Sequence, residues 1–278
     1  MSEDAITPAG RGRPLAGQVW AVMRMELRRG VSWRSLWLFV VAFAPLLVIA
    51  GHALEDHEHQ LELETLIIAG IIQFYYLRFG LFLGCLGVFI RLLRGEVSER
   101  TLHYLFLAPL RREALLVGKF LAGALTVILF FGTGVLASLL LMYAHFGAGR
   151  AFLFHGPGLA HLRLYLLMTT LACLGYGAVF LAFSLLFKNP MVPAVLVLFW
   201  EGINGALPPW LKHVSVTFYL KPLVPVEMPI RGISGLFTVV AEPTPVWLAV
   251  SGLLVFTALI VAFACWRIRR LEVSYSTD

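Results

Sequence analysis

The sequence predicts an all-α polytopic membrane protein with six transmembrane helices. Of its 278 residues, 59% are hydrophobic and only 14% are charged, with a mean hydropathy of +0.84, whereas soluble domains carry about 25% charged residues. Six apolar runs are long enough for helices that cross the ~30 Å hydrocarbon core of a bilayer. They are continuously apolar, while the strands of a membrane β-barrel alternate over shorter segments. The predicted spans cover residues 36–54, 66–90, 114–146, 162–187, 191–207 and 246–266.

The distribution of Lys and Arg predicts how these spans are oriented. If the amino terminus is cytoplasmic, the outer side holds only a few basic residues, namely Arg150, Arg163, Lys212, Lys221 and Arg231. The other basic residues, apart from Arg78, then lie on the cytoplasmic side, as the positive-inside rule requires. We therefore expect residues 36–270 to form one transmembrane domain with both termini in the cytoplasm, and residues 271–278 to form a cytoplasmic tail.

The first 35 residues divide into two parts. Residues 1–16 are polar and contain Pro and Gly, so we expect a disordered cytoplasmic tail. In residues 17–35, Trp20, Met23 and Leu27 recur at helical spacing, and arginines occupy the other faces. This pattern predicts an amphipathic helix lying in the cytoplasmic interface of the membrane. The alternative is a basic segment that simply flanks the first span.

The first outer loop is acidic. Residues 55–64 contain no Lys or Arg, and they include His57 and His59, with His52 just before. Histidines and carboxylates bind zinc or copper, so a metal site is one interpretation. The spacing does not match HExxH or another constrained motif, so we interpret the segment as a solvated acidic loop and predict no metal site.

The last outer loop, residues 208–245, is unusually apolar. Its apolar stretches, 214–220 and 230–241, are too short to cross the membrane, and several prolines break any longer helix. These stretches are predicted to be re-entrant or interfacial segments. They are expected either to cover an outer vestibule as a lid or to rest on the membrane interface.

Two predicted spans carry a charged residue. Arg78 in the second span and Glu201 in the fifth each lie thirteen residues from a basic residue, Arg91 and Lys188 respectively, which predicts similar depths. Since a charge in lipid needs a partner or water, the two are predicted to pair or to share a polar cavity. In the alternative, Glu201 lies at the outer interface and Arg78 binds backbone or water. Together with Tyr75, they are our candidates for a translocation pathway.

Enzymatic motifs are absent from the sequence. Gly118-Lys119 lacks the upstream glycine and the following Ser or Thr of a P-loop, and there is no HExxH or GxSxG. The three cysteines, Cys85, Cys173 and Cys265, lie in apolar runs without metal-ligand spacing. The basic residues flank apolar runs and form no stripe on a soluble fold, which argues against a nucleic-acid partner. We predict that the chain is not an enzyme and binds no cofactor itself.

The segment between the second and third spans, residues 94–113, is charged and amphipathic. Ser98 can cap a short helix that ends at Pro109. Its apolar residues share one face of that helix, namely Leu102, Leu105 and Phe106. Such a helix would lie across the cytoplasmic surface, either as a docking element or as a plain interfacial hairpin between two spans.

This segment resembles the cytoplasmic loop of type-2 ABC transporter permeases. The shared pattern is a glutamate followed by Thr101-Leu102, Leu105, Pro109, Arg111-Arg112 and Gly118-Lys119. In that family the loop is a coupling helix that docks on a separate ATP-binding cassette subunit, which binds ATP and Mg. The resemblance implies a set of coupling residues, namely Glu99, Arg100, Leu102, Leu105, Phe106 and Arg111. Arg100 departs from the family pattern, which usually has glycine at that position.

The resemblance also implies a function. The chain would be the permease subunit of an ABC exporter in a prokaryotic-type plasma (inner) membrane, surrounded by lipid and completed as a homodimer by a second permease copy. Two interpretations from other classes stay open. One is a secondary transporter or channel that uses Arg78 and Glu201, although the spans show no inverted repeat. The other is a membrane assembly protein that transports nothing. The sequence does not indicate a substrate.

Overall fold

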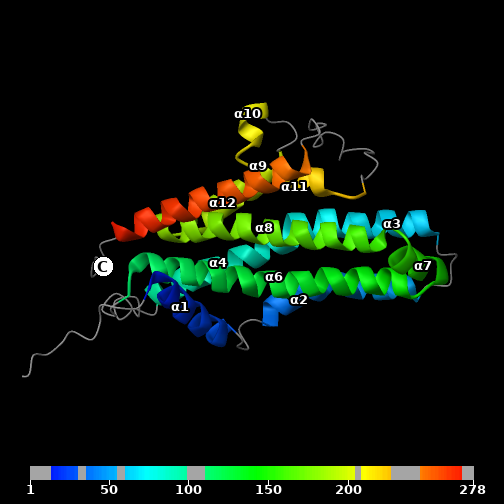
Figure 1. The fold of residues 1–278 in the computed structure, drawn as a ribbon, viewed down its shortest axis with the longest axis horizontal. Helices are drawn as coiled ribbons and strands as arrows, with labels where there is room; N and C mark the ends of the chain where they lie inside the picture. The colour runs from blue at the N-terminus through cyan, green and yellow to red at the C-terminus, as the bar shows by residue number, and fades with distance from the viewer. Residues whose placement is uncertain are drawn as a thin grey trace, which may run out of the picture.

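The computed structural model describes residues 14–30, 36–54, 60–98, 110–203, 208–226 and 245–270. Within these ranges all regular structure is helical (Figure 1), which confirms the predicted all-α class. Five helices in the described ranges are long and apolar enough to cross a membrane, namely Leu36–Ala53, Leu61–Leu93, Arg112–Ala144, Gly158–Leu186 and Val246–Arg269.

The helices follow one another without any intervening sheet in the described ranges. In chain order they are α1 (Leu15–Gly30), α2 (Leu36–Ala53), α3 (Leu61–Gly70), the π-helix η2 (Ile71–Gly80), α4 (Leu81–Ser98), α6 (Arg112–Ala144), α7 (Gly147–His155), α8 (Gly158–Leu186), α9 (Met191–Gly202), α10 (Pro209–Lys212), α11 (Val216–Leu220), the 3₁₀ turn η4 (Lys221–Leu223) and α12 (Val246–Arg269). The second long helix is therefore the continuous run of α3, η2 and α4.

Two of the six predicted spans differ clearly from the observed helices. The second, predicted for 66–90, is part of a longer apolar helix, Leu61–Leu93, because acidic residues of the outer loop form the first turn of α3. The fifth, predicted for 191–207, contains α9, whose 12 residues rise about 18 Å. That length is too short to cross a ~30 Å core by itself.

The shorter predicted segments are described only in part. α1 occupies most of the interfacial helix predicted for 17–35, and it begins at Leu15, inside the predicted tail. α11 lies within the predicted re-entrant stretch 214–220. The coupling helix, the second re-entrant stretch, the carboxy-terminal tail and most of the amino-terminal tail fall outside the described residues.

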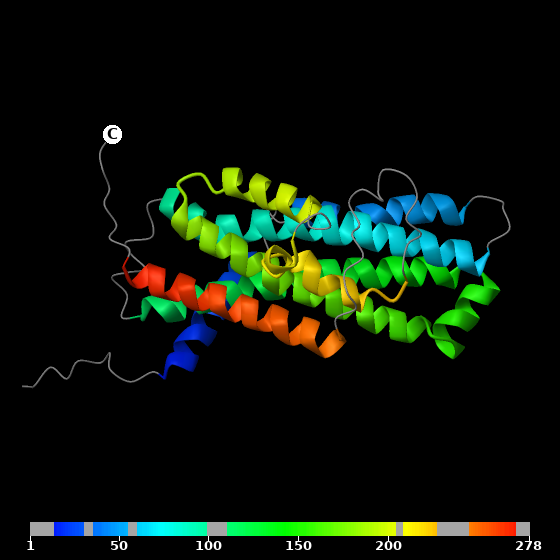
Figure 2. The ribbon, with the colours of Figure 1, turned by 90° about the horizontal axis from the view of Figure 1, so that it is seen from above.

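α8 lies at the centre of the bundle. In its most apolar stretch 67% of the residues are buried, compared with 22% in α2 and α12. α8 packs against α4, α6 and α12, while α6 also packs against α1 and α2. Figures 1 and 2 show α12 running along α8, and Figure 1 shows α2 along α6. α2 and α12 are thus peripheral helices that expose large apolar faces, as contact with lipid requires.

Glycines let these helices approach one another closely. A Cβ added at Gly134 of α6 would lie 2.5 Å from the backbone oxygen of Ala42 in α2. At Gly84 of α4 it would lie 2.4 Å from the ring of Phe131 in α6. In lipid, no hydrophobic driving force brings helices together. Small residues let the helices approach closely, and the resulting van der Waals packing stabilises the bundle.

Candidate functional site

The second span changes its winding in the middle. The ten residues of η2 form a π-helix, in which hydrogen bonds reach five residues along the chain. Two tyrosines fix this stretch to α2: Tyr75 donates to the backbone oxygen of Val41 at 2.7 Å, and Tyr76 donates to that of Ala42 at 2.9 Å. These bonds hold in place the helix that carries Arg78.

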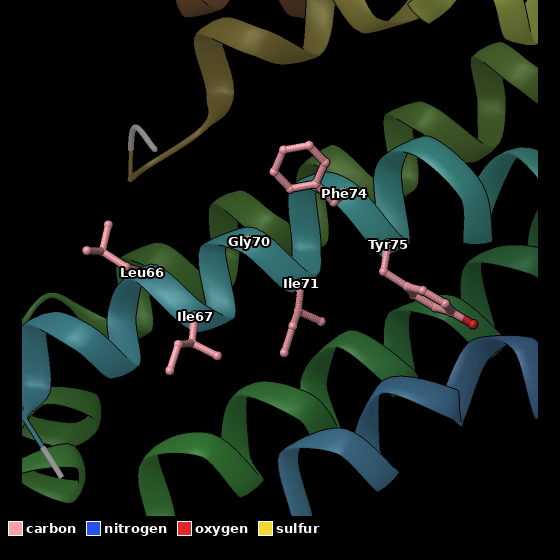
Figure 3. A pocket seen from close by; sticks show the side chains of 6 residues that line it. All are labelled: Leu66, Ile67, Gly70, Ile71, Phe74 and Tyr75. Carbon is pink, nitrogen blue, oxygen red and sulfur yellow. The ribbon is translucent and has the colours of Figure 1, made fainter. Parts of the chain in front are cut away.

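An apolar groove of about 460 Å³ runs along α3 and η2. Its lining residues, which define the apolar groove below, are Leu66, Ile67, Gly70, Ile71, Phe74 and Tyr75. Figure 3 shows Leu66 and Phe74 on one flank of the helix, while Ile67, Ile71 and Tyr75 point toward α2 and α6 on the other. The volume is in the range of small-molecule sites, and the predicted pathway residue Tyr75 is part of the wall.

Glu201 at the end of α9 holds the beginning of α11. Its carboxylate accepts hydrogen bonds from the hydroxyl of Ser215 at 2.7 Å and from the backbone N–H groups of Val216 at 2.9 Å and Thr217 at 3.1 Å. Backbone N–H groups at the start of a helix lack partners within the helix, and a carboxylate satisfies them well. Glu201 therefore ties the short apolar helix α11 to α9.

The side chain of Arg78, on η2, extends to the end of α9, next to Glu201. Its Nη2 atom lies 3.0 Å from the position that a Cβ would take at Gly202, the residue after Glu201. Within the described part of the chain, no ion pair of 4 Å or less joins Arg78 to Glu201, and the carboxylate instead accepts the bonds from α11. The two predicted partners thus lie in one polar region without a direct ion pair.

Lys221 of η4 adds a second cation to this region. Tyr176 of α8 bonds to Thr217 at 3.2 Å, and Gln73 of η2 donates to the backbone oxygen of Val226 at 3.0 Å, so the chain around Lys221 is fixed on both sides. Burial lowers the pKa of Lys221, and the positive charges of Lys212 and Arg78 lower it further, while Glu201 opposes the shift. Lys221 was not among the residues predicted from the sequence. It could have been, because it is a cation directly after the apolar stretch 214–220, which we predicted to be re-entrant.

A buried ion pair joins α1 to α6. Lys119 Nζ donates to Glu26 Oε1 at 2.6 Å and to the backbone oxygen of Leu92 at 3.0 Å. The side chain of Lys119 is 1% exposed and that of Glu26 is 8% exposed. One lysine therefore connects α1, the last turns of α4 and the first turns of α6.

Close backbone packing accompanies this pair. A Cβ at Gly118 would lie 2.7 Å from Cβ of Val22, so only glycine lets α1 approach α6 there. Sequence reasoning did not predict the pair, although two signals were present. Lys119 is a charge in an apolar run, which needs a partner, and Glu26 is the only acidic residue in the predicted interfacial helix.

A family model described as an ABC-2 family transporter protein matches residues 27–203, from the last turn of α1 to the turn after α9. The chain belongs to the ABC-2 transporter family. No curated protein matches the chain.

Family membership makes the chain the membrane-spanning permease subunit of an ABC transporter. It confirms the resemblance inferred from the segment between the second and third spans. ABC-2 permeases are membrane components without ATPase activity of their own, in agreement with the lack of a P-loop in the sequence. Together with the five long apolar helices, it also establishes a multi-pass membrane protein.

One predicted coupling residue of this ABC-2 permease lies in the described structure. Arg111 is exposed just before α6, and its backbone N–H donates to Gln18 Oε1 of α1 at 3.1 Å. Glu113 pairs with Arg269 at 2.5 Å, so the start of α6 contacts both α1 and the end of α12. The other predicted coupling residues fall outside the described ranges, namely Glu99, Arg100, Leu102, Leu105 and Phe106.

The described end of the predicted acidic loop, residues 60–64, runs into the first turn of α3. Glu64 is fully buried in the first turn of α3, and His52 Nε2 lies 3.1 Å from both of its carboxylate oxygens. This contact closes α2 onto α3. Among the described residues, no group of three His, Cys, Asp or Glu side chains could hold a metal ion; His57 and His59 fall outside these residues.

Proposed function

We propose that this permease works as an exporter driven by separate cytoplasmic ATP-binding cassette subunits and completed by a second copy of the chain. The ATPases would supply the ATP and Mg²⁺ sites that the permease sequence lacks. ATP binding would supply the free-energy difference between inward-open and outward-open states. The Lys and Arg distribution supports a topology with both termini in the cytoplasm, and the family supports a prokaryotic-type plasma (inner) membrane as its location.

The observation that carries this proposal is the junction around Lys119. Its ammonium group, on α6, bridges Glu26 of α1 and Leu92 of α4. α4 and α6 flank the predicted coupling segment, residues 94–113. A force on the segment would therefore reach α1, α4 and α6 together. Packed, rigid helices with buried polar contacts are the kind of element that carries coupling between distant sites.

We further propose that the ATPase contacts the permease through the predicted coupling residues Glu99, Arg100, Leu102, Leu105, Phe106 and Arg111. The apolar members would fill a cleft on the ATPase, and the charged members would form its polar rim, the usual division of roles in an interface. For the substrate pathway, we propose Arg78, Tyr75 and Glu201. Since Glu201 ties α11 to α9, a shift of α9 would move α11 with it.

Co-purification of the full-length permease tests the proposal. We expect the wild-type chain to be recovered from its own membranes with a stoichiometric ATPase. Leu105→Asp and Phe106→Asp should each lose that subunit, because a charge in an apolar docking face is costly. Trp210→Ser is the matched control, since Trp210 is 71% exposed on α10, on the predicted outer side, and should keep the ATPase.

A different result would contradict the proposal. If the purified permease is an oligomer of itself alone and an ion gradient drives transport in vesicles, the ATP-driven mechanism is wrong. In that case the secondary-transporter interpretation of Arg78 and Glu201 takes its place.

A further inference from the structure

Arg78 and Lys221 place two positive charges in one region, where the described residues provide one carboxylate, Glu201. Neither side chain forms a hydrogen bond or ion pair with any residue that the structure describes. The nearby acid, Glu201, already accepts three bonds from α11. Among the described residues of this region, the three cations Arg78, Lys212 and Lys221 therefore outnumber the one carboxylate.

Both cations are partly withdrawn from water, so this arrangement has a free-energy cost. The pKa of Lys221 is lowered by burial and by the charges of Lys212 and Arg78, which is the expected response of a lysine held near other cations. An anion between Arg78 and Lys221 would offset the repulsion and accept hydrogen bonds from both side chains.

The apolar groove ends close to Arg78 along the same helix. Leu66, Gly70, Phe74 and Arg78 follow one another at four-residue spacing along α3 and η2, which puts them on one stripe of the helix. Figure 3 shows Leu66 and Phe74 on the same flank of the helix. Next to Phe74, Gln73 donates to the backbone oxygen of Val226, in the segment that follows η4. The apolar groove, with a volume of about 460 Å³, thus ends about one helical turn before Arg78.

We propose that Arg78 and Lys221 bind the anionic oxygen group, a phosphate or a carboxylate, of an amphiphile whose apolar part lies in the apolar groove. Arginine binds both groups through two parallel N–H donors, and lysine adds a point charge. The identification of this amphiphile as transported cargo rests on the proposed function. Its binding to the permease does not, because binding requires neither ATP nor the ATPase.

Equilibrium binding to the full-length permease in phosphatidylcholine nanodiscs tests the site. The amphiphilic probes are dodecyl phosphate and dodecanoate, the free anions are inorganic phosphate and acetate, and the uncharged control is dodecanol. We expect both charged amphiphiles to bind saturably. Arg78→Gln and Lys221→Gln should each weaken this binding by about tenfold or more, as expected for loss of one charge-assisted contact.

Matched variants separate binding from folding. Arg78→Lys and Lys221→Arg keep the charges and should weaken binding less than the glutamine variants do. Of the two, Arg78→Lys should have the larger effect, because it loses the paired N–H donors of the guanidinium group. Arg163→Gln removes an exposed cation of α8 and should change nothing. Suppose that a glutamine variant elutes as the wild type does and still binds its ATPase, yet fails to bind the amphiphile. That result supports the binding site whether or not the proposed function is correct.

Three results would overturn the proposal. Equal binding to the wild type and to the Arg78→Gln/Lys221→Gln double variant would show that the cations are not involved. Phosphate or acetate binding as tightly as the dodecyl probes would make this a site for free anions and not for an amphiphile. Absence of amphiphile binding, with disulfide formation between Phe74→Cys copies, would assign the groove to a permease dimer interface.

Discussion

Lys119 of α6 and Glu26 of α1 form a 2.6 Å ion pair, and both side chains are almost completely buried. α1 is thereby attached to the bundle by a specific polar contact as well as by its apolar face. A helix lying loosely in the interface would keep its charges in water or at lipid phosphates. The pair makes α1 part of the folded permease.

Removing one partner of this pair should be more damaging than removing both. Lys119→Ala or Glu26→Ala leaves a buried charge behind, which costs about 3–5 kcal/mol. The double variant Glu26→Leu/Lys119→Met should be less destabilised than either single variant. Unfolding of the purified permease in detergent measures this, and Arg24→Ala, an exposed change on α1, is the control. Additive effects of the two single changes would show that the residues do not act as a pair.

Gly134 should be intolerant of even one added methyl group. A Cβ there would lie 2.5 Å from a backbone oxygen of α2, which cannot move aside as a side chain could. We expect Gly134→Ala to lower the free energy of unfolding by about 1–3 kcal/mol. Gly51→Ala meets nothing within 4 Å and should be neutral or stabilising by up to about 1 kcal/mol. Thermal unfolding of the two variants side by side decides this, and a stable Gly134→Ala would mean that α2 and α6 are further apart.

Loss of the Glu201 carboxylate should release α11. In Glu201→Ala, the N–H groups of Val216 and Thr217 lose their acceptor, at a cost of about 1–3 kcal/mol for the group. Hydrogen exchange of residues 216–220 should then speed up by about tenfold or more, since 1.4 kcal/mol corresponds to a factor of ten. Ser215→Ala removes the hydroxyl contact and keeps the carboxylate, so a smaller effect is expected. Equal exchange in wild type and Glu201→Ala would contradict the role of Glu201.

The lowered pKa of Lys221 should appear as a pH dependence of stability. Between its pKa in the folded protein and its ordinary value of 10.5, the unfolded chain binds more protons, so stability rises with pH in that window. Below the pKa of the folded state, Lys221 is protonated in both the folded and the unfolded state, and its charge destabilises the folded protein by the full amount. Lys221→Met should therefore be more stable than the wild type at pH 7, and the difference should shrink toward pH 10. A difference independent of pH would show that Lys221 has its ordinary pKa.

The long helices could be predicted because lipid imposes a simple requirement. A helix that crosses it must be continuously apolar for about 20 residues, and α6, α8 and α12 meet that condition in the sequence alone. α9 shows the limit of the rule. Its apolar run continues to Leu207, but the helix ends at Gly202, where Glu201 turns to the N-terminus of α11. A tertiary contact, which periodicity does not encode, sets that boundary.

The charged residues were found more easily than their partners. A charge inside an apolar run is visible in the sequence, as Arg78 and Glu201 were, and Lys119 could have been included by the same reasoning. Which groups meet depends on helix packing. Glu201 binds α11, and Lys119 binds a residue 93 positions away. The π-helix was equally unpredictable, because contacts to α2 accompany it and no residue type marks it.

The π-helix η2 links the length of the second span to the rotation of its two halves about the helix axis. It holds more residues in each turn than an α-helix does, so its ten residues complete fewer turns. Rewinding them as an α-helix would rotate α4 against α3 about their shared axis and would pull Tyr75 and Tyr76 from their acceptors on α2. A lengthwise pull on α4 would thereby become a rotation of Arg78 relative to Lys221. The change of winding alone would turn Arg78, without any tilt of the helix.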